Sequence, residues 1–368
     1  MKRIILFVLT TIVIISLMNP IIQSEQFSRI NKSSDLPSSF SWRDIDGINY
    51  VTDIKDQSPA PTCEAYGFCA ILETMMQYQL GEIYTPDLSE THLYFYAGGT
   101  YKAGGVNVID AANYLIEHGV PDEGCYPDPH RAFDYPFESL DGWENRTVKI
   151  TEWAWVDHDM ESMKTALIQH GPLLLTMPVW MDFYYYKTGV YEHKWGPRVG
   201  GHVVTIVGYD DSQECWIVKN SWGKGWGDGG WFKISYDEDF IAQWYGPGTG
   251  VMQLEGIYGN FKPNVPYVQI EKPIYSKSYL FGFEFKKIFN KVDLQSSAAR
   301  IFGPLKVKVN AENTEKVEFY IDDELKGTVE EAPFIWELDT TTGLHTLEAR
   351  AYNSTNQSID IVDFYSFF

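Results

Sequence analysis

The sequence predicts an α+β region followed by an all-β sandwich, and three observations support this prediction. Apolar residues recur at helical spacing in several segments between residues 62 and 170. Short β-branched and aromatic runs separated by glycine-rich turns then continue to residue 235. Beyond a proline-containing stretch at residues 260–266, apolar and polar residues alternate almost to the C-terminus. A chain of 368 residues is long enough for two such domains.

Three helices are expected in the first region. The first begins after Thr62, the expected N-cap, and runs to about Leu80, so Cys63 would lie at its N-terminus. The second covers residues 108–116 and the third residues 160–170, and each is followed by a glycine.

Short strands are expected after the third helix. In the first region they lie at residues 173–177, 203–209, 216–218 and 231–235, which suits an antiparallel sheet or barrel. In the last hundred residues the alternating runs lie at 307–309, 317–321, 334–338, 347–349 and 359–361. This spacing favours a sandwich of the immunoglobulin type, although the Cys…Trp…Cys signature is absent.

The first 24 residues have the pattern of a secretory signal peptide. Lys2 and Arg3 precede an apolar run of 15 residues, which ends before a polar segment. The alternative is an uncleaved membrane anchor, but the run is shorter than the ~20 residues that span a bilayer. We expect a secreted or cell-surface protein. Its expected parts are a signal peptide at 1–24, a linker at 25–36, a larger domain at 37–262 and the sandwich at 266–368.

The composition excludes several classes of partner. With 29 basic and 50 acidic residues the formal net charge is −21, the opposite of what binding to nucleic acid requires. The same charge disfavours docking on an anionic membrane surface. Four cysteines are too few for a disulfide scaffold. Cys63 and Cys69 cannot pair if they share a helix, and the redox state of Cys69, Cys125 and Cys215 stays open.

Five residues together could carry out acyl transfer by a thiol. Singly, a cysteine is usually apolar core and a histidine usually structural. In combination, Cys63 at a helix N-terminus supplies a nucleophile that the helix dipole and His202 activate. Asn220 would orient the His202 ring, and Trp222 would shield that pair from water. The side chain of Gln57 and the backbone N–H of Cys63 would form the oxyanion hole.

The sequence between residues 37 and 260 resembles the papain-like cysteine proteases. The matching stretches are 40–43 (FSWR), 54–57 (IKDQ), 88–93 (LSETHL), 171–172 (GP), 182–183 (DF), 189–191 (GVY), 201–209 (GHVVTIVGY), 216–223 (WIVKNSWG) and 226–231 (WGDGGW). The resemblance implies a helical lobe, a β-barrel lobe and hydrolysis of protein or peptide substrates, without metal or cofactor. It also implies a Cys63 thioester acyl-enzyme, with His202 as general base and then general acid.

The segment around the nucleophile departs from the family pattern. Ala60 and Lys102 stand where the resemblance implies a disulfide. Glu64 replaces a tryptophan, and its carboxylate would oppose ionisation of the neighbouring thiol. The side chains of adjacent helical residues point about 100° apart, so we expect the Glu64 carboxylate and the Cys63 sulfur to be separated by ~8 Å. The resulting rise in the thiol pKa should be modest. A long inhibitory propeptide is not expected, because only about a dozen residues separate the signal peptide from Pro37.

Two other functions remain open at this stage. A papain-like surface protein with little or no activity would bind peptides or cell-wall material, and Glu64 motivates that alternative. Transpeptidation would use the same residues with an amine in place of water. The C-terminal part resembles the immunoglobulin-like domains of bacterial and archaeal surface proteins, which implies contacts at a cell surface or merely a stabilising appendage.

Overall fold

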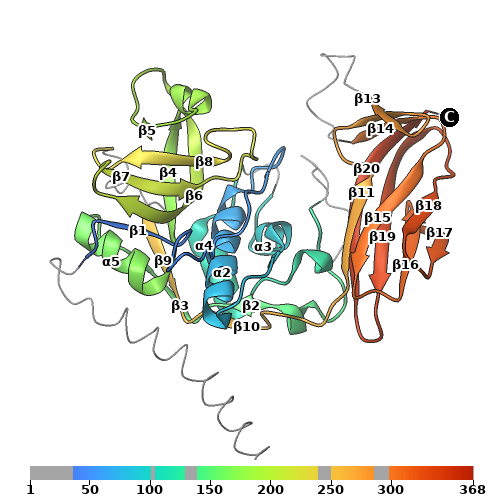
Figure 1. Cartoon of the computed structure of the whole chain (residues 1–368), viewed down its shortest axis with the longest axis horizontal. Coiled ribbons are helices and arrows are strands. Elements are labelled where there is room, and N and C mark those ends of the chain that lie inside the picture. The colour runs from blue at the N-terminus through green and yellow to red at the C-terminus, as the bar shows by residue number, and fades with distance from the viewer. Residues whose placement is uncertain (1–35, 101–103, 129–138, 239–249, 286–297, 368) are drawn as a thin grey trace, which may run out of the picture. The chain divides into compact units, whose positions relative to one another are not determined.

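The computed structural model describes residues 36–100, 104–128, 139–238, 250–285 and 298–367 (Figure 1). The predicted signal peptide, almost all of the predicted linker and Lys102 lie outside these ranges. Within the described ranges, no helix is both long and apolar enough to span a membrane. The chain forms two compact units. The first comprises 1–56, 66–86 and 150–258, and the second comprises 57–65, 87–149 and 259–368. The domain boundary predicted at 262–266 stays a prediction.

The first unit is built on an eight-stranded sheet. Its strands are β1 (Ser39–Ser41), β3 (Glu152–Trp155), β4 (Leu173–Trp180), β5 (Val190–Tyr191), β6 (Arg198–Asp210), β7 (Cys215–Lys219), β8 (Trp231–Ser235) and β9 (Val251–Glu255). Their order is β3-β9-β4-β6-β7-β8-β5, and β1 also pairs with β6. The four strands predicted for this region are confirmed as β4, β6, β7 and β8. The long β6 is paired on both sides, so its side chains have fixed surroundings.

Two helices accompany this sheet, and both were predicted. They are α2 (Cys63–Leu80) and α5 (Met160–His170). A Cβ atom on Gly67 of α2 would lie 2.6 Å from Leu174 of β4 and 3.1 Å from Val203 of β6. The missing side chain therefore lets α2 pack closely on these two strands. The hydroxyl of Thr205 on β6 also donates to the Gly67 carbonyl at 3.1 Å.

The second unit includes two helices and several short elements. These are α3 (Glu90–Tyr96), α4 (Val108–Glu117), the 3₁₀ turns η2 (Glu123–Cys125) and η3 (Trp143–Arg146), β2 (Val148–Lys149) and β10 (Tyr258–Gly259); the turn η4 (Met181–Tyr185) belongs to the first unit. Helix α4 confirms the helix predicted at 108–116, and the Asn107 side chain caps it. Helix α3 was not predicted because it is only seven residues long, although Ser89 caps it by accepting from His92 N–H.

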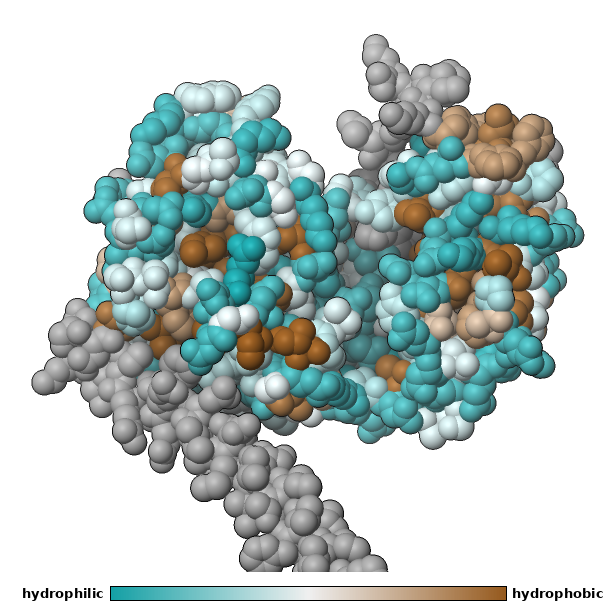
Figure 2. All heavy atoms as spheres, viewed as in Figure 1, coloured by the Kyte–Doolittle hydropathy of each residue, from teal (hydrophilic) through white to brown (hydrophobic). Residues whose placement is uncertain are grey.

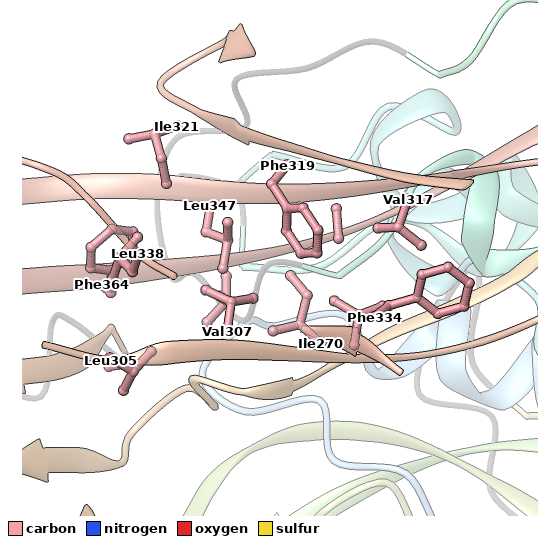
Figure 3. Close-up of a cluster of buried hydrophobic side chains, with 14 of the residues drawn as sticks. Ile270, Leu305, Val307, Val317, Phe319, Ile321, Phe334, Leu338, Leu347 and Phe364 are labelled. Atoms are coloured by element: carbon pink, nitrogen blue, oxygen red, sulfur yellow. The ribbon is translucent and has the colours of Figure 1, made fainter. Parts of the chain in front are cut away.

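The C-terminal residues form the predicted sandwich of two sheets (Figure 3). The strands are β11 (Tyr267–Lys272), β12 (Ser278–Leu280), β13 (Phe283–Phe285), β14 (Ala299–Phe302), β15 (Lys306–Glu312), β16 (Lys316–Ile321), β17 (Glu324–Val329), β18 (Phe334–Glu337), β19 (Gly343–Tyr352) and β20 (Gln357–Phe367). One sheet is β11-β15-β18, and the other is β13-β12-β14-β20-β19-β16-β17. Apolar side chains such as Val307, Phe319 and Leu347 fill the space between the two sheets. All five strands predicted here are confirmed, whereas β11 to β14 and β17 were missed.

One end of the sandwich exposes large apolar side chains. Figure 2 shows brown, hydrophobic residues over the region where Figure 1 labels β13 and β14. Phe281 and Phe283 are 67% and 78% exposed there. Phe281 has a φ of 47°, a left-handed conformation that is uncommon for an aromatic residue. The hairpin between β12 and β13 therefore presents its aromatic rings to solvent.

Candidate active site

Strand pairing in the first unit brings three of the five predicted site residues together. In the antiparallel pair of β6 and β7, Thr205 lies opposite Lys219. Just beyond the end of β7, Asn220 Oδ1 lies 2.7 Å from His202 Nε2, and the rings of Trp222 and His202 have centroids 4.7 Å apart. His202 and Asn220 are buried, and Trp222 is half-buried. The sheet therefore holds these side chains in one cluster.

The His202 ring is oriented by a hydrogen bond. His202 Nε2 lies 2.7 Å from Asn220 Oδ1, and this oxygen also accepts from the Ser221 backbone N–H at 2.8 Å. Because the oxygen is an acceptor, Nε2 carries the proton and Nδ1 has a free lone pair. Burial lowers the pKa of His202 to about 4 and outweighs the bond to Asn220, which raises it. His202 is therefore a neutral base at neutral pH, with Nδ1 as its acceptor atom.

Trp222 lies against the His202 ring. The two ring centroids are 4.7 Å apart. Phe183 packs edge-on against Trp222 at 5.5 Å, and Tyr184 stacks on it at 5.3 Å. Aromatic packing of this kind keeps water away from one face of the imidazole and fixes the indole.

Cys63 and Gln57 belong to the second unit. Cys63 is buried and is the first residue of α2, as predicted. The Gln57 side chain donates from Nε2 to the Ala60 carbonyl at 3.0 Å, so this amide is held in the loop that precedes the helix. The predicted role of Gln57 in an oxyanion hole stays a prediction. The expected cap on α2 is wrong, because Thr62 Oγ1 is buried and has no hydrogen-bond partner among the described residues.

Glu64 interacts directly with the Cys63 thiol. Its carboxyl accepts hydrogen bonds from the Cys63 thiol, from its own backbone N–H and from the Val106 backbone N–H. The loop at Gly105 and Val106 lies against this carboxyl, since a Cβ atom on Gly105 would be 2.5 Å from Glu64 Oε1. Sequence reasoning missed this loop, and the adjacent Gly104 and Gly105 were its only signal.

The other cysteines have the character of core residues. Cys69, Cys125 and Cys215 are buried like Cys63, and none of the four forms a disulfide. Burial raises the pKa of the thiols of Cys125 and Cys215, which makes both poor nucleophiles. Across the described ranges, no group of three His, Cys, Asp or Glu side chains is arranged to hold a metal ion.

The chain contains the residue types that thiol-based acyl transfer requires. They include a thiol at a helix N-terminus and a neutral imidazole oriented by an amide. Residues 36–246 match the family model described as papain family cysteine protease, and residues 294–349 match the model of a bacterial Ig domain. The structure and the family models therefore agree on where the α+β and the all-β regions lie.

Several proteases are similar to this chain. Cysteine proteinase 2 of Entamoeba histolytica is 34% identical over 214 residues, which cover 54% of this chain and 63% of that protein. Digestive procathepsin L2 from the Tenebrio molitor midgut is 25% identical with a TM-score of 0.52, covering 61% of this chain and 70% of the other. Xylellain of Xylella fastidiosa has a TM-score of 0.52 at 20% identity, covering 61% of this chain and 88% of the other, and shares the fold. The papain model spans more than half of the 368 residues, and the chain belongs to the papain family of cysteine proteases.

Proposed function

We propose that this cysteine peptidase hydrolyses peptide bonds through a thioester on Cys63. The Cys63 sulfur attacks the substrate carbonyl while its proton passes to His202 Nδ1. His202 then protonates the leaving amine, and the C–N bond breaks. Water, deprotonated by His202, attacks the thioester, releases the acid product and restores the thiol. Gln57 and the Cys63 backbone N–H would stabilise the oxyanion in both halves.

The hydrogen bond between His202 and Asn220 is the observation that best supports this proposal. A general base needs a free lone pair and a fixed orientation, and this bond supplies both at a buried position. Asn220 cannot itself take up the proton, so it acts on the reaction only through the His202 ring. The match of residues 36–246 to the papain family model supports Cys63 as the partner nucleophile.

The test combines active-site labelling with turnover. We expect a papain-directed epoxide to add once to the full chain, at Cys63, and a fluorogenic peptide to be hydrolysed. Cys63→Ala should lose the label and lower kcat/KM at least about a thousandfold. Cys69→Ala, which changes a buried cysteine on the same helix, is the matched control and should keep both. Turnover that survives in Cys63→Ala would refute the assignment.

A peptide-binding protein without turnover is the second candidate function. The hydrogen bond from the Cys63 thiol to Glu64 favours it, because this bond keeps the proton on sulfur. In that case Cys63→Ala would bind peptides as tightly as the wild type, and neither protein would hydrolyse them.

We also propose that the chain is exported and that its Ig-like region makes contacts at a cell surface. The charged and apolar pattern of residues 1–24 supports export. N-terminal sequencing of the protein recovered from the medium should show cleavage near residue 24, whereas an intact N-terminus would favour the anchor. Deleting residues 266–368 should lower recovery with the cell envelope if these contacts exist.

A further inference from the structure

The Glu64 carboxyl is hydrogen-bonded to the proposed nucleophile, Cys63. It accepts a hydrogen bond from the Cys63 thiol, which lowers the pKa of Glu64. Its second oxygen, Oε2, is buried and has no hydrogen-bond partner among the described residues. Ionising a carboxyl that has one buried, unpaired oxygen costs free energy. The charged form of Glu64 is therefore disfavoured where it lies next to the thiol.

The neighbouring loop is shaped around this carboxyl. Gly105 has a φ of 133°, and a Cβ atom there would lie 2.5 Å from Glu64 Oε1. Any other residue at this position would be strained and would displace the carboxyl. The next residue, Val106, donates its backbone N–H to Glu64. The loop therefore accommodates an acid at position 64.

Among the residues that the structure describes, the titratable groups that face Glu64 are Cys63 and Tyr94. Cys63 faces it from its own helix, and Tyr94 faces it from α3, with its hydroxyl donating to the Thr100 carbonyl at 3.0 Å. From the loop, the backbone N–H of Val106 faces it. Burial raises the pKa of Glu64 to about 7 and outweighs the three hydrogen bonds that lower it. Glu64 therefore changes its charge near neutral pH while bonded to the thiol.

We propose that Glu64 is a positioning residue that acts as a proton-linked brake on the Cys63 nucleophile. The ionised carboxylate accepts the thiol hydrogen bond and repels a thiolate, so the proton stays on sulfur. When Glu64 takes a proton from solvent, the repulsion ends and the thiol can give its own proton to His202. This inference rests on the proposed function of Cys63. It gives the thiol a restraint that strengthens as the pH rises through neutrality.

The direct test measures alkylation of Cys63 by iodoacetamide in the full chain across pH, with the adduct located by mass spectrometry. At about pH 5, Glu64 is protonated, and the wild type and Glu64→Gln should react at similar rates. At about pH 8, Glu64→Gln should react at least about fivefold faster, as expected for unit charges ~4 Å apart in water-like surroundings. The pH profile of kcat/KM should show the same divergence above neutrality.

Controls separate this inference from the proposed function. Glu117→Gln removes the same charge from a side chain that is 72% exposed on α4, and its alkylation profile should match the wild type. Equal profiles for the wild type and Glu64→Gln, with Cys63 labelled and active, would refute the brake alone. Absence of any Cys63 adduct, or peptide turnover in Cys63→Ala, would refute the proposed function.

A measurement on the wild type covers the case in which Glu64→Gln fails to fold. Carboxyl NMR can follow the titration of Glu64 before and after Cys63 is alkylated. The thiol hydrogen bond lowers the pKa of Glu64, so blocking the sulfur should raise that pKa. An unchanged titration midpoint would show that the two groups are not coupled and would overturn the brake.

Discussion

Arg146, which is buried, and Glu64, whose Oε2 atom is buried, differ in how well they are paired within the second unit. Arg146 donates to both carboxylate oxygens of Asp122, to the Gln357 carbonyl at 2.6 Å and to the Ser358 hydroxyl at 3.0 Å. Glu64, by contrast, has a buried oxygen with no partner among the described residues. One group carries a charge that its surroundings compensate, and the other carries a charge that its surroundings resist.

This difference separates a structural role from a regulatory one. Arg146 joins the turn η3 to the start of β20, which lies 211 residues further along the chain. Gly124 adds to this contact, since a Cβ atom on it would lie 2.6 Å from Ser358 Oγ. A fully paired ion is stable in one charge state, whereas an under-paired acid can change state within the physiological pH range. The pairing thus predicts that Arg146 affects stability at every pH, whereas Glu64 affects reactivity and the pH dependence of stability.

The largest effect is expected from Arg146→Met. This change leaves the Asp122 carboxylate partly buried without its cation, which costs about 3–5 kcal/mol in comparable cases. Urea unfolding should therefore shift to a clearly lower midpoint. Lys306→Met is the matched control, because its ion pair with Glu337 is exposed on both sides and contributes ~0–1 kcal/mol. Equal shifts of the urea midpoint in the two variants would show that the contact of Arg146 with β20 does not stabilise the fold.

A smaller effect is expected from Glu64 on the pH dependence of stability. The pKa of Glu64 is raised from 4.5 to about 7 on folding, so its favourable contribution is complete below pH 4.5 and is lost as the pH rises through 7. The loss amounts to up to about 3 kcal/mol. Unfolding measured at acid and alkaline pH should show this decline in the wild type and not in Glu64→Gln. Other titrating groups cancel in that comparison, and parallel pH curves would contradict the pKa shift.

The sequence predicted the framework better than the polar contacts. The first helix, α4, α5 and the strand that carries His202 were predicted because apolar periodicity reports burial directly. The side chains of His202, Asn220 and Trp222 contact one another because they lie on or directly after the neighbouring strands β6 and β7. Sequence motifs on those two strands were enough to predict this contact. The bond between Glu64 and Cys63 was missed because side-chain direction depends on a loop forty residues away in sequence. The contact of Arg146 with β20 was also missed, since no local pattern encodes it.

The smallest predicted effect concerns the start of the helix that carries Cys63. An N-cap that is replaced by alanine usually costs about 1 kcal/mol, because a helix N–H loses its acceptor. Asn107 makes such a bond to Ile109 N–H at 2.8 Å, so Asn107→Ala should destabilise the chain by this amount.

Thr62 should behave differently, although it precedes a helix in the same way. Its Oγ1 is buried without a partner among the described residues, so Thr62→Ala removes an uncompensated hydroxyl and no hydrogen bond. We expect a change within about 0.5 kcal/mol, or a slight gain, in urea unfolding. A loss as large as that of Asn107→Ala would mean that Thr62 does cap the helix. In that case Thr62 Oγ1 would be hydrogen-bonded at the start of α2. The Glu64 carboxyl would then be the one unpaired polar group described near the start of this helix, and the contrast with the well-paired Arg146 would be weaker.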